Sequence, residues 1–139
     1  LLERLATVRG IVVPGERRGR ELGYPTANLA RSVEGYVPAD GVYAAYATVD
    51  GRTMPAAVSI GNNPTFVGVP DKQIEAHLLD EDLDLYGKMV EIAFVEYIRG
   101  MEKFSSVGEL VTQMTHDEVR VRHLLGMPAR TTPIGPRVE

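Results

Sequence analysis

A segment near the N-terminus, residues 15 to 28, combines residue types that bind phosphate groups. Arginine side chains can donate paired hydrogen bonds to phosphate oxygens, and glycine lets the backbone approach a ligand closely. The segment holds three residues of each kind: Arg17, Arg18, Arg20, Gly15, Gly19 and Gly23. This composition indicates a nucleotide phosphate site, and it also fits a solvated surface loop.

The end of this segment could bind a divalent cation. Pro25 pushes Tyr24 before it toward an extended conformation. Thr26 and Asn28 are two positions apart, so on an extended chain their side chains point to the same side. Both end in oxygen atoms, which Mg²⁺ prefers as ligands beside substrate phosphates. The alternative is a structural loop in which the asparagine makes a turn.

A carboxylate in the middle of the chain, within residues 73–79, is the third candidate. Alternation along a strand predicts that Glu75, His77 and Leu79 face one way, and that the apolar residues between them face the other. A carboxylate on a strand can accept the proton of an alcohol during phosphoryl transfer. The alternative is a carboxylate at a wet rim with no chemical role.

Several well-known catalytic patterns are absent from the sequence. It contains no Walker-type phosphate loop, no dinucleotide-binding glycine pattern, no nucleophile elbow and no zinc-protease helix motif. His116 and His123 are seven positions apart on an expected helix, a rise of about 10 Å, which is too far to share one metal ion. We interpret both as surface histidines.

The composition is that of a globular protein. The 139 residues are 44% hydrophobic and 24% charged, enough for one domain with its own core. The net charge of −4 argues against nucleic acid as the main partner, and no apolar run is long enough to span a membrane. The absence of cysteine fits a cytoplasmic protein. Because the chain starts at Leu1 rather than Met, we expect a fragment of a longer protein.

The elements that must position these candidates are mostly strands. Five stretches carry strand signals: 6–13, 41–50, 53–60, 73–79 and 88–98. Asp50 and Gly51 predict a tight hairpin, because a type I′ turn needs positive φ at both central positions. Pro55 cannot donate to a ladder and is expected at an edge or a bulge. Closely spaced strands of this kind predict an antiparallel barrel or sandwich.

One amphipathic helix is predicted in the last third of the chain. Ser106 suits the N-cap position, and Glu109 is placed to reach back toward it. Gly126 can end the helix, and Pro128 prevents its continuation. The apolar residues fall mostly on one stripe that must pack against the β structure: Val107, Leu110, Val111, Met114, Val121 and Leu125. Residues 128–139 are expected to form a tail.

Several motifs, in order along the chain, resemble those of riboflavin kinases. The hallmark is Pro25-Thr26-Ala27-Asn28, which follows the glycine- and arginine-rich loop. Further matches are found at residues 10–13, 38–43, 59–66, 75–77, 84–87 and 99–104. The resemblance covers about residues 6 to 125, and separated motifs in the right order are more specific than one pattern.

The resemblance implies a mainly β fold, a six-stranded antiparallel Greek-key barrel with one long C-terminal α-helix, over residues 1–127. It implies that the chain makes FMN and ADP from riboflavin and ATP, with Mg²⁺ accompanying ATP. The chain is similar to the C-terminal kinase module of bacterial bifunctional riboflavin kinase/FAD synthetases. A covalently linked N-terminal FMN adenylyltransferase module is therefore an expected partner.

The resemblance also implies roles for particular residues. Glu75 matches the general base, and Thr26 and Asn28 match the contacts to Mg²⁺ and phosphate. The expected ATP contacts are Gly15, Arg18, Arg20, Gly23, Pro25, Thr26, Asn28, Leu78, Asp80 and Tyr86. The expected flavin contacts are Arg99, Glu102, Lys103 and Phe104.

Three positions depart from the family pattern. Many relatives have a further glycine where this chain has Arg17, which affects the expected phosphate contacts. Gly100 and Met101 replace the Pro-Glu pair often found after the arginine. A glycine there should loosen the flavin loop, so we expect altered riboflavin affinity rather than lost activity.

Two other functions fit parts of the pattern. One is a non-catalytic flavin-binding or regulatory module on the same barrel, and the joint presence of Glu75, Thr26 and Asn28 disfavours it. The other is an oligonucleotide-binding barrel, which would need stacking aromatics and a basic face. The chain has no Trp, three Phe and a net negative charge. A riboflavin kinase is therefore the favoured prediction.

Overall fold

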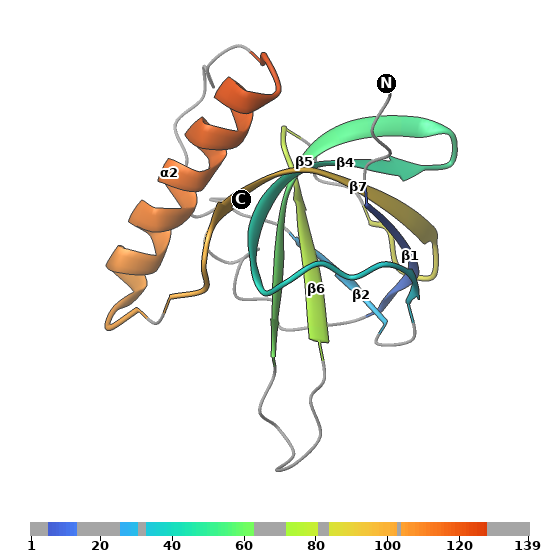
Figure 1. Ribbon diagram of the computed structural model, residues 1–139, viewed down its shortest axis with the longest axis horizontal. Coiled ribbons are helices and arrows are strands. Elements are labelled where there is room, and N and C mark those ends of the chain that lie inside the picture. Colours follow the sequence, from blue (N-terminus) through green and yellow to red (C-terminus); the bar gives the residue numbers. More distant parts are fainter. Residues whose placement is uncertain are drawn as a thin grey trace.

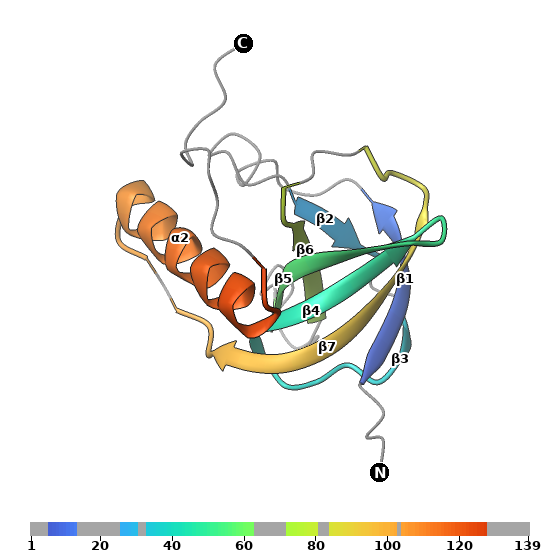
Figure 2. The ribbon, with the colours of Figure 1, turned by 90° about the horizontal axis from the view of Figure 1, so that it is seen from above.

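Figures 1 and 2 show the computed structural model, which describes residues 6–13, 26–30, 33–62, 72–80, 84–102 and 104–127. Its elements are β1 (Thr7–Val13), β2 (Thr26–Leu29), β3 (Glu34–Gly35), β4 (Gly41–Val49), β5 (Arg52–Asn62), β6 (Lys72–Leu78), β7 (Met89–Arg99) and α2 (Val107–Leu124). The five predicted strands are confirmed, with ends shifted by one or two positions. Within the described ranges, no helix has the length and hydropathy needed to cross a bilayer. The tail predicted for residues 128–139 lies outside the described residues.

The strands close into a barrel. Among the described residues, the hydrogen-bonded order is β2-β6-β5-β4-β7-β1-β3, and β2 also pairs with β1. The extra pairing closes a ring of six strands and leaves the short β3 as an addition to β1. Strand β7 returns beside β4 after the consecutive strands β4, β5 and β6, which is a Greek key. The expected six-stranded antiparallel Greek-key barrel is confirmed.

Alternation along the strands separates the barrel interior from its outer face. Val8, Val58, Ile74 and Ile92 point inward and are almost fully buried. Side chains at neighbouring positions of the same strands point outward. Strand β2 was not predicted, because its four residues are too few to show a period.

The β4–β5 hairpin follows the sequence prediction. Asp50 and Gly51 have φ angles of 51° and 78°, the left-handed values that a type I′ turn requires. Pro55 was expected at an edge or a bulge, and on the β6 side it lies just past the end of the β5–β6 pairing, which begins at Ala56. On its other side β5 pairs with β4. The Pro55 carbonyl accepts from the Leu79 N–H just beyond the end of β6. The N–H that proline lacks would point to the same side as this carbonyl, beyond the last β5–β6 pair. Pro55 therefore removes no hydrogen bond from the β5–β6 ladder.

Helix α2 begins and ends where the sequence predicts. Ser106 Oγ accepts a hydrogen bond from the Glu109 N–H at 3.1 Å, and Gly126 has a φ of 70° after the last turn. The Glu109 carboxylate accepts from the hydroxyl and the N–H of Ser105, one residue before the predicted partner. These two hydrogen bonds lower the pKa of Glu109, and the bond from the Ser105 hydroxyl contributes more than the bond from the N–H.

The Ser106→Ala variant should test the importance of this cap. Loss of the hydroxyl acceptor is expected to lower the free energy of unfolding by about 1 kcal/mol. Urea denaturation followed by circular dichroism measures the change, with Arg120→Ala on the exposed face of α2 as the control. Equal stability of Ser106→Ala and the unchanged chain would show that the cap is dispensable.

Helix α2 lies on the outside of the barrel, beside β4, β5 and β7 (Figures 1 and 2). Val121 packs there in one apolar cluster with Ala44 and Leu79, which confirms the predicted docking. The predicted apolar stripe is buried at Val121 and packs at Leu125, but Val107 at its start is 44% exposed. Three charged residues, which the stripe did not include, are buried beside Val121: Asp117, Glu118 and Arg122.

Candidate functional site

The candidate metal ligand and the candidate base lie on neighbouring strands. Asn28 of β2 is the Cα partner of Glu75 of β6 in an antiparallel ladder. Ser59 of β5 stands opposite Glu75 on its other side. Ala27 and Leu29 belong to the barrel core, so Asn28 between them faces outward. Two candidates that are distant in the sequence therefore occupy one row across the outer face.

A residue that the sequence analysis did not single out joins the two candidates. Gln73 Nε2 donates to Asn28 Oδ1 at 3.3 Å and to Glu75 Oε1 at 3.0 Å. Gln73 and Glu75 are two positions apart on β6, so they share a face of the strand. This spacing was the available signal in the sequence. The shared donor restricts the orientation of both acceptor side chains.

Thr26, the second candidate metal ligand, begins β2 and is the Cα partner of His77. Its side chain lies outside the described part of the structure. The same holds for five other residues of the predicted phosphate segment: Gly15, Arg18, Arg20, Gly23 and Pro25. The structure therefore places the backbone of β2 beside β6, and the phosphate contacts stay a prediction.

The residues expected near adenine and ribose lie at and beyond the end of β6. The Leu78 side chain is 5% exposed in the barrel core, so it is the backbone there that a ligand could reach. Asp80 follows two positions later with a half-exposed side chain. Tyr86 is largely exposed, and its N–H donates to Asp84 Oδ1 at 3.2 Å. Leu78 and Asp80 are thus carried by the same strand as Glu75 or by the turn that follows it.

Arg99, expected to contact the flavin, joins the end of β7 to α2. Its Nε and Nη2 donate to the two carboxylate oxygens of Asp117 at 2.8 and 2.7 Å. Its Nη1 donates to the Gly100 carbonyl at 3.0 Å, and its guanidinium carbon lies 5.9 Å from the centre of the Phe104 ring. The hydrogen bonds to Asp117 raise the pKa of Arg99. Arg99 therefore anchors the loop that follows β7.

An open groove of about 550 Å³ lies between this loop and the first turns of α2. Its lining residues are Glu102, Phe104, Ser106, Gly108, Glu109, Thr112, Gln113 and His116. Two of the expected flavin contacts, Glu102 and Phe104, are among them, whereas Lys103 lies outside the described residues. The volume is within the range of small-ligand sites, about 300–1,000 Å³. The Phe104 ring could stack against a planar ligand.

The chemistry of Asn28 fits a magnesium ion shared with a nucleotide. Its amide oxygen is a hard donor with two lone pairs, and the hydrogen bond from Gln73 uses one of them. The residue is 6% exposed on a strand, so its position is fixed. Mg²⁺ usually takes few protein ligands and completes its shell with water and phosphate oxygens.

The family model and the curated relatives agree on one family. A family model described as "Flavokinase: Riboflavin kinase" matches residues 2–125. The bifunctional riboflavin kinase/FMN adenylyltransferase of Escherichia coli (strain K12) is 38% identical over 130 residues, which cover 91% of this chain and 40% of that protein. The chain therefore spans less than half the length of this curated relative.

Two solved structures are similar to the barrel. Riboflavin kinase from Trypanosoma brucei has a TM-score of 0.62 at 25% identity, and the match covers 91% of this chain and 80% of that chain. A protein described as a macrolide-efflux protein from Streptococcus pneumoniae has a TM-score of 0.77 at 41% identity, over 84% of this chain and 38% of that chain.

Proposed function

The chain belongs to the riboflavin kinase family, and from this premise we propose that it transfers the γ-phosphoryl group of ATP to the 5′-hydroxyl of riboflavin, releasing FMN and ADP. One observation carries the proposal. Asn28 and Glu75 are cross-strand partners, and Gln73 donates a hydrogen bond to each. Phosphoryl transfer to an alcohol needs a cation ligand and a proton acceptor at such close quarters.

Glu75 is the proton acceptor in this proposal. It takes the proton of the riboflavin 5′-hydroxyl as the hydroxyl oxygen attacks the γ-phosphorus. The hydrogen bond from Gln73 to Oε1 fixes the direction in which the carboxylate faces. Because the strand restricts the orientation of the carboxylate, a larger share of its conformations suits proton transfer during in-line attack.

Asn28 and Thr26 are the proposed ligands of the magnesium ion that accompanies ATP. When bound, Mg²⁺ supplies charge neutralisation on the phosphate oxygens. Arg18 and Arg20 are the proposed donors to the same phosphates. Asn28 holds its place through the β1–β2 and β2–β6 ladders, which pair it with Val13 and Glu75.

The two substrates enter from different elements in this proposal. The adenosine part of ATP lies at the end of β6, near Leu78, Asp80 and Tyr86. The flavin ring occupies the groove between α2 and the loop after β7, where Phe104 offers a stacking surface and Glu102 offers a polar group. Lys103 stays a predicted flavin contact outside the described residues. Arg99 keeps this loop on α2 through Asp117.

The proposal has consequences for the whole protein. We assign the kinase to residues 1–127 and the tail to residues 128–139. The relative from E. coli also carries FMN adenylyltransferase activity in its name, and we extend to this protein a covalently linked module of that kind. A biosynthetic enzyme of this sort, without cysteine, is expected to work in the cytoplasm.

One incubation tests the proposed function. The chain is mixed with riboflavin and MgATP, and flavins and nucleotides are separated by chromatography. FMN and ADP are expected in equal amounts, without FAD, and EDTA is expected to stop both. ADP released without FMN, or riboflavin bound without turnover, would instead indicate a hydrolase or a non-catalytic flavin-binding module.

The Gln73→Leu variant should show how much the bridging amide contributes. Loss of its two hydrogen bonds removes the alignment of Asn28 and Glu75, so kcat is expected to fall by about tenfold with both KM values little changed. Steady-state FMN formation measures this, with Thr53→Val at the hairpin end of β5 as a control. A kcat within twofold of the unchanged chain would mean that the alignment does not depend on Gln73.

A further inference from the structure

Helix α2 buries charged side chains that docking on a barrel does not require. Glu118 is 1% exposed and Arg122 is 4% exposed. Burying charges costs free energy unless they are paired, and apolar residues of similar size often give equal or greater stability. Apolar packing is already provided in the same contact by Val121 and Leu79. The buried charges therefore point to a role in fixing the position of another part of the protein.

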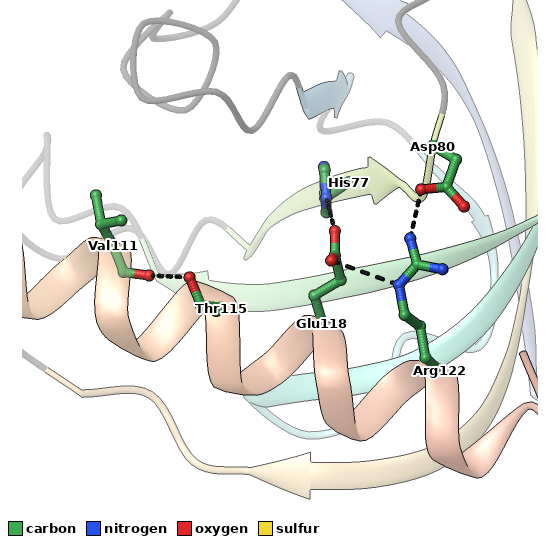
Figure 3. Close-up of polar contacts among 6 residues, drawn as sticks. All are labelled: His77, Asp80, Val111, Thr115, Glu118 and Arg122. Atoms are coloured by element: carbon green, nitrogen blue, oxygen red, sulfur yellow. Dashed lines mark hydrogen bonds and ion pairs between the residues drawn. The ribbon is translucent and has the colours of Figure 1, made fainter. Parts of the chain in front are cut away.

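These charges contact the strand that carries the proposed base (Figure 3). Glu118 Oε1 lies 3.5 Å from His77 Nε2, and Glu118 Oε2 accepts from Arg122 Nε at 3.4 Å. Arg122 Nη2 donates to Asp80 Oδ1. His77 lies in β6 and Asp80 lies just beyond it. Helix α2 therefore contacts the end of this strand through both residues.

The contact at Asp80 lies at a turn with left-handed backbone. Asp80 has a φ of 62°, in a region that residues other than glycine enter uncommonly, although aspartate does so more readily than most. Its side chain is 51% exposed, whereas that of Arg122 is 5% exposed. One side of the Asp80 carboxylate thus faces a buried guanidinium, and the residue still borders solvent.

We propose that Glu118 and Arg122 are positioning residues for the nucleotide: they hold Asp80 and the end of β6 in the conformation that binds ATP. The proposal rests on the proposed function, because that function places the adenosine of ATP at this turn. Glu118 orients Arg122, and Arg122 orients Asp80. Neither α2 residue touches the substrate.

The geometry makes the requirement for arginine specific. Arg122 serves two carboxylates through two different nitrogens, Nε toward Glu118 and Nη2 toward Asp80. Lysine has the same charge but a single nitrogen at its tip, so it cannot span both partners in this arrangement. The Arg122→Lys variant keeps the charge of the cluster and removes the pair of nitrogens that reach the two carboxylates.

The Arg122→Lys variant is expected to raise the KM for ATP by about tenfold, with kcat and the KM for riboflavin within about threefold of the unchanged chain. The affinity for MgADP, measured by calorimetry, should fall by the same factor. Val121→Ala, on the adjacent buried position of α2, is the matched control for lost stability. A general loosening of the helix would raise the KM for ATP in both variants and would overturn the proposal.

A double variant tests whether Arg122 acts through Asp80. If it does, Asp80→Asn combined with Arg122→Lys binds MgADP no more weakly than Asp80→Asn alone. Effects that multiply would show an independent role and contradict the proposal. Circular dichroism checks that each variant is folded, and Glu118→Gln replaces Arg122→Lys if the latter does not fold, with a rise of about threefold expected.

The outcomes separate this proposal from the proposed function. If the unchanged chain makes FMN and Arg122→Lys has an unchanged KM for ATP, the function stands and the positioning role fails. If the chain makes no FMN but binds MgADP, the function fails and calorimetry still decides the positioning role. If the chain neither makes FMN nor binds MgADP, the proposed function and the positioning role are both overturned.

Discussion

Glu75→Gln is expected to lower kcat for FMN formation by about 10²- to 10⁴-fold, the usual contribution of a general base. Glutamine has the shape of glutamate but cannot accept the proton of the riboflavin hydroxyl at neutral pH. Its amide can still hydrogen-bond to Gln73, so the row that holds Asn28 should persist. Affinity for MgADP is therefore expected to stay within about twofold, because the base acts on the alcohol and not on the nucleotide.

The control for this prediction is Glu96→Gln, an exposed glutamate of β7, which should leave FMN formation unchanged. Single-turnover assays with both variants separate the chemical step from product release. Near-normal FMN formation by Glu75→Gln would show that another group accepts the proton, and would remove the main chemical role assigned to β6.

Asn28→Leu should have the second-largest effect. Leucine fills a similar volume on the outer face of β2 but offers no oxygen to a cation, so we expect kcat/KM for MgATP to fall by about 10- to 100-fold. A weakened metal site can be partly refilled by mass action. Raising free Mg²⁺ should therefore restore some of the activity of this variant, whereas it should not restore Glu75→Gln.

Titration of activity against free Mg²⁺ measures this difference. The control is Thr48→Val, which removes a hydroxyl that lies 2.9 Å from that of Thr53 in the β4–β5 hairpin. A midpoint for Mg²⁺ that is the same in Asn28→Leu and in the unchanged chain would place the cation elsewhere.

Local sequence signals predicted most of the fold. Asp50 and Gly51 specify their turn because few residue pairs tolerate two positive φ angles. Ser106 and Gly126 mark the ends of α2 because each satisfies backbone groups that a helix end exposes. The five longer strands follow from alternation and β-branched residues. The closed Greek-key order came from the resemblance, since the local patterns encode only the pairing of β4 with β5.

The site could be predicted only in part from the sequence. Asn28 and Gln73 are 45 positions apart, and their contact depends on the register between β2 and β6, which is set by the whole barrel. The outward face of Glu75 was predictable from alternation, but the donor that orients it was overlooked. The metal, ATP and flavin contacts of all the site residues stay predictions.

The buried face of α2 was predicted only in part. Val121 of the predicted apolar stripe is fully buried, whereas Val107 at its start is 44% exposed. The charged residues of the buried face have partners on other elements, as in Arg99–Asp117 and Asp80–Arg122. Helical periodicity uses the sequence of one element alone, so it cannot predict ion pairs between two elements.

The most direct test of the proposed site is a crystal structure of the chain with MgADP and riboflavin bound. We predict Mg²⁺ at about 2.1 Å from Asn28 Oδ1, and the 5′-hydroxyl of riboflavin within about 3 Å of the Glu75 carboxylate. A structure in which both ligands bind away from the outer face of β2 and β6, with Glu75 in contact with neither, would contradict the account.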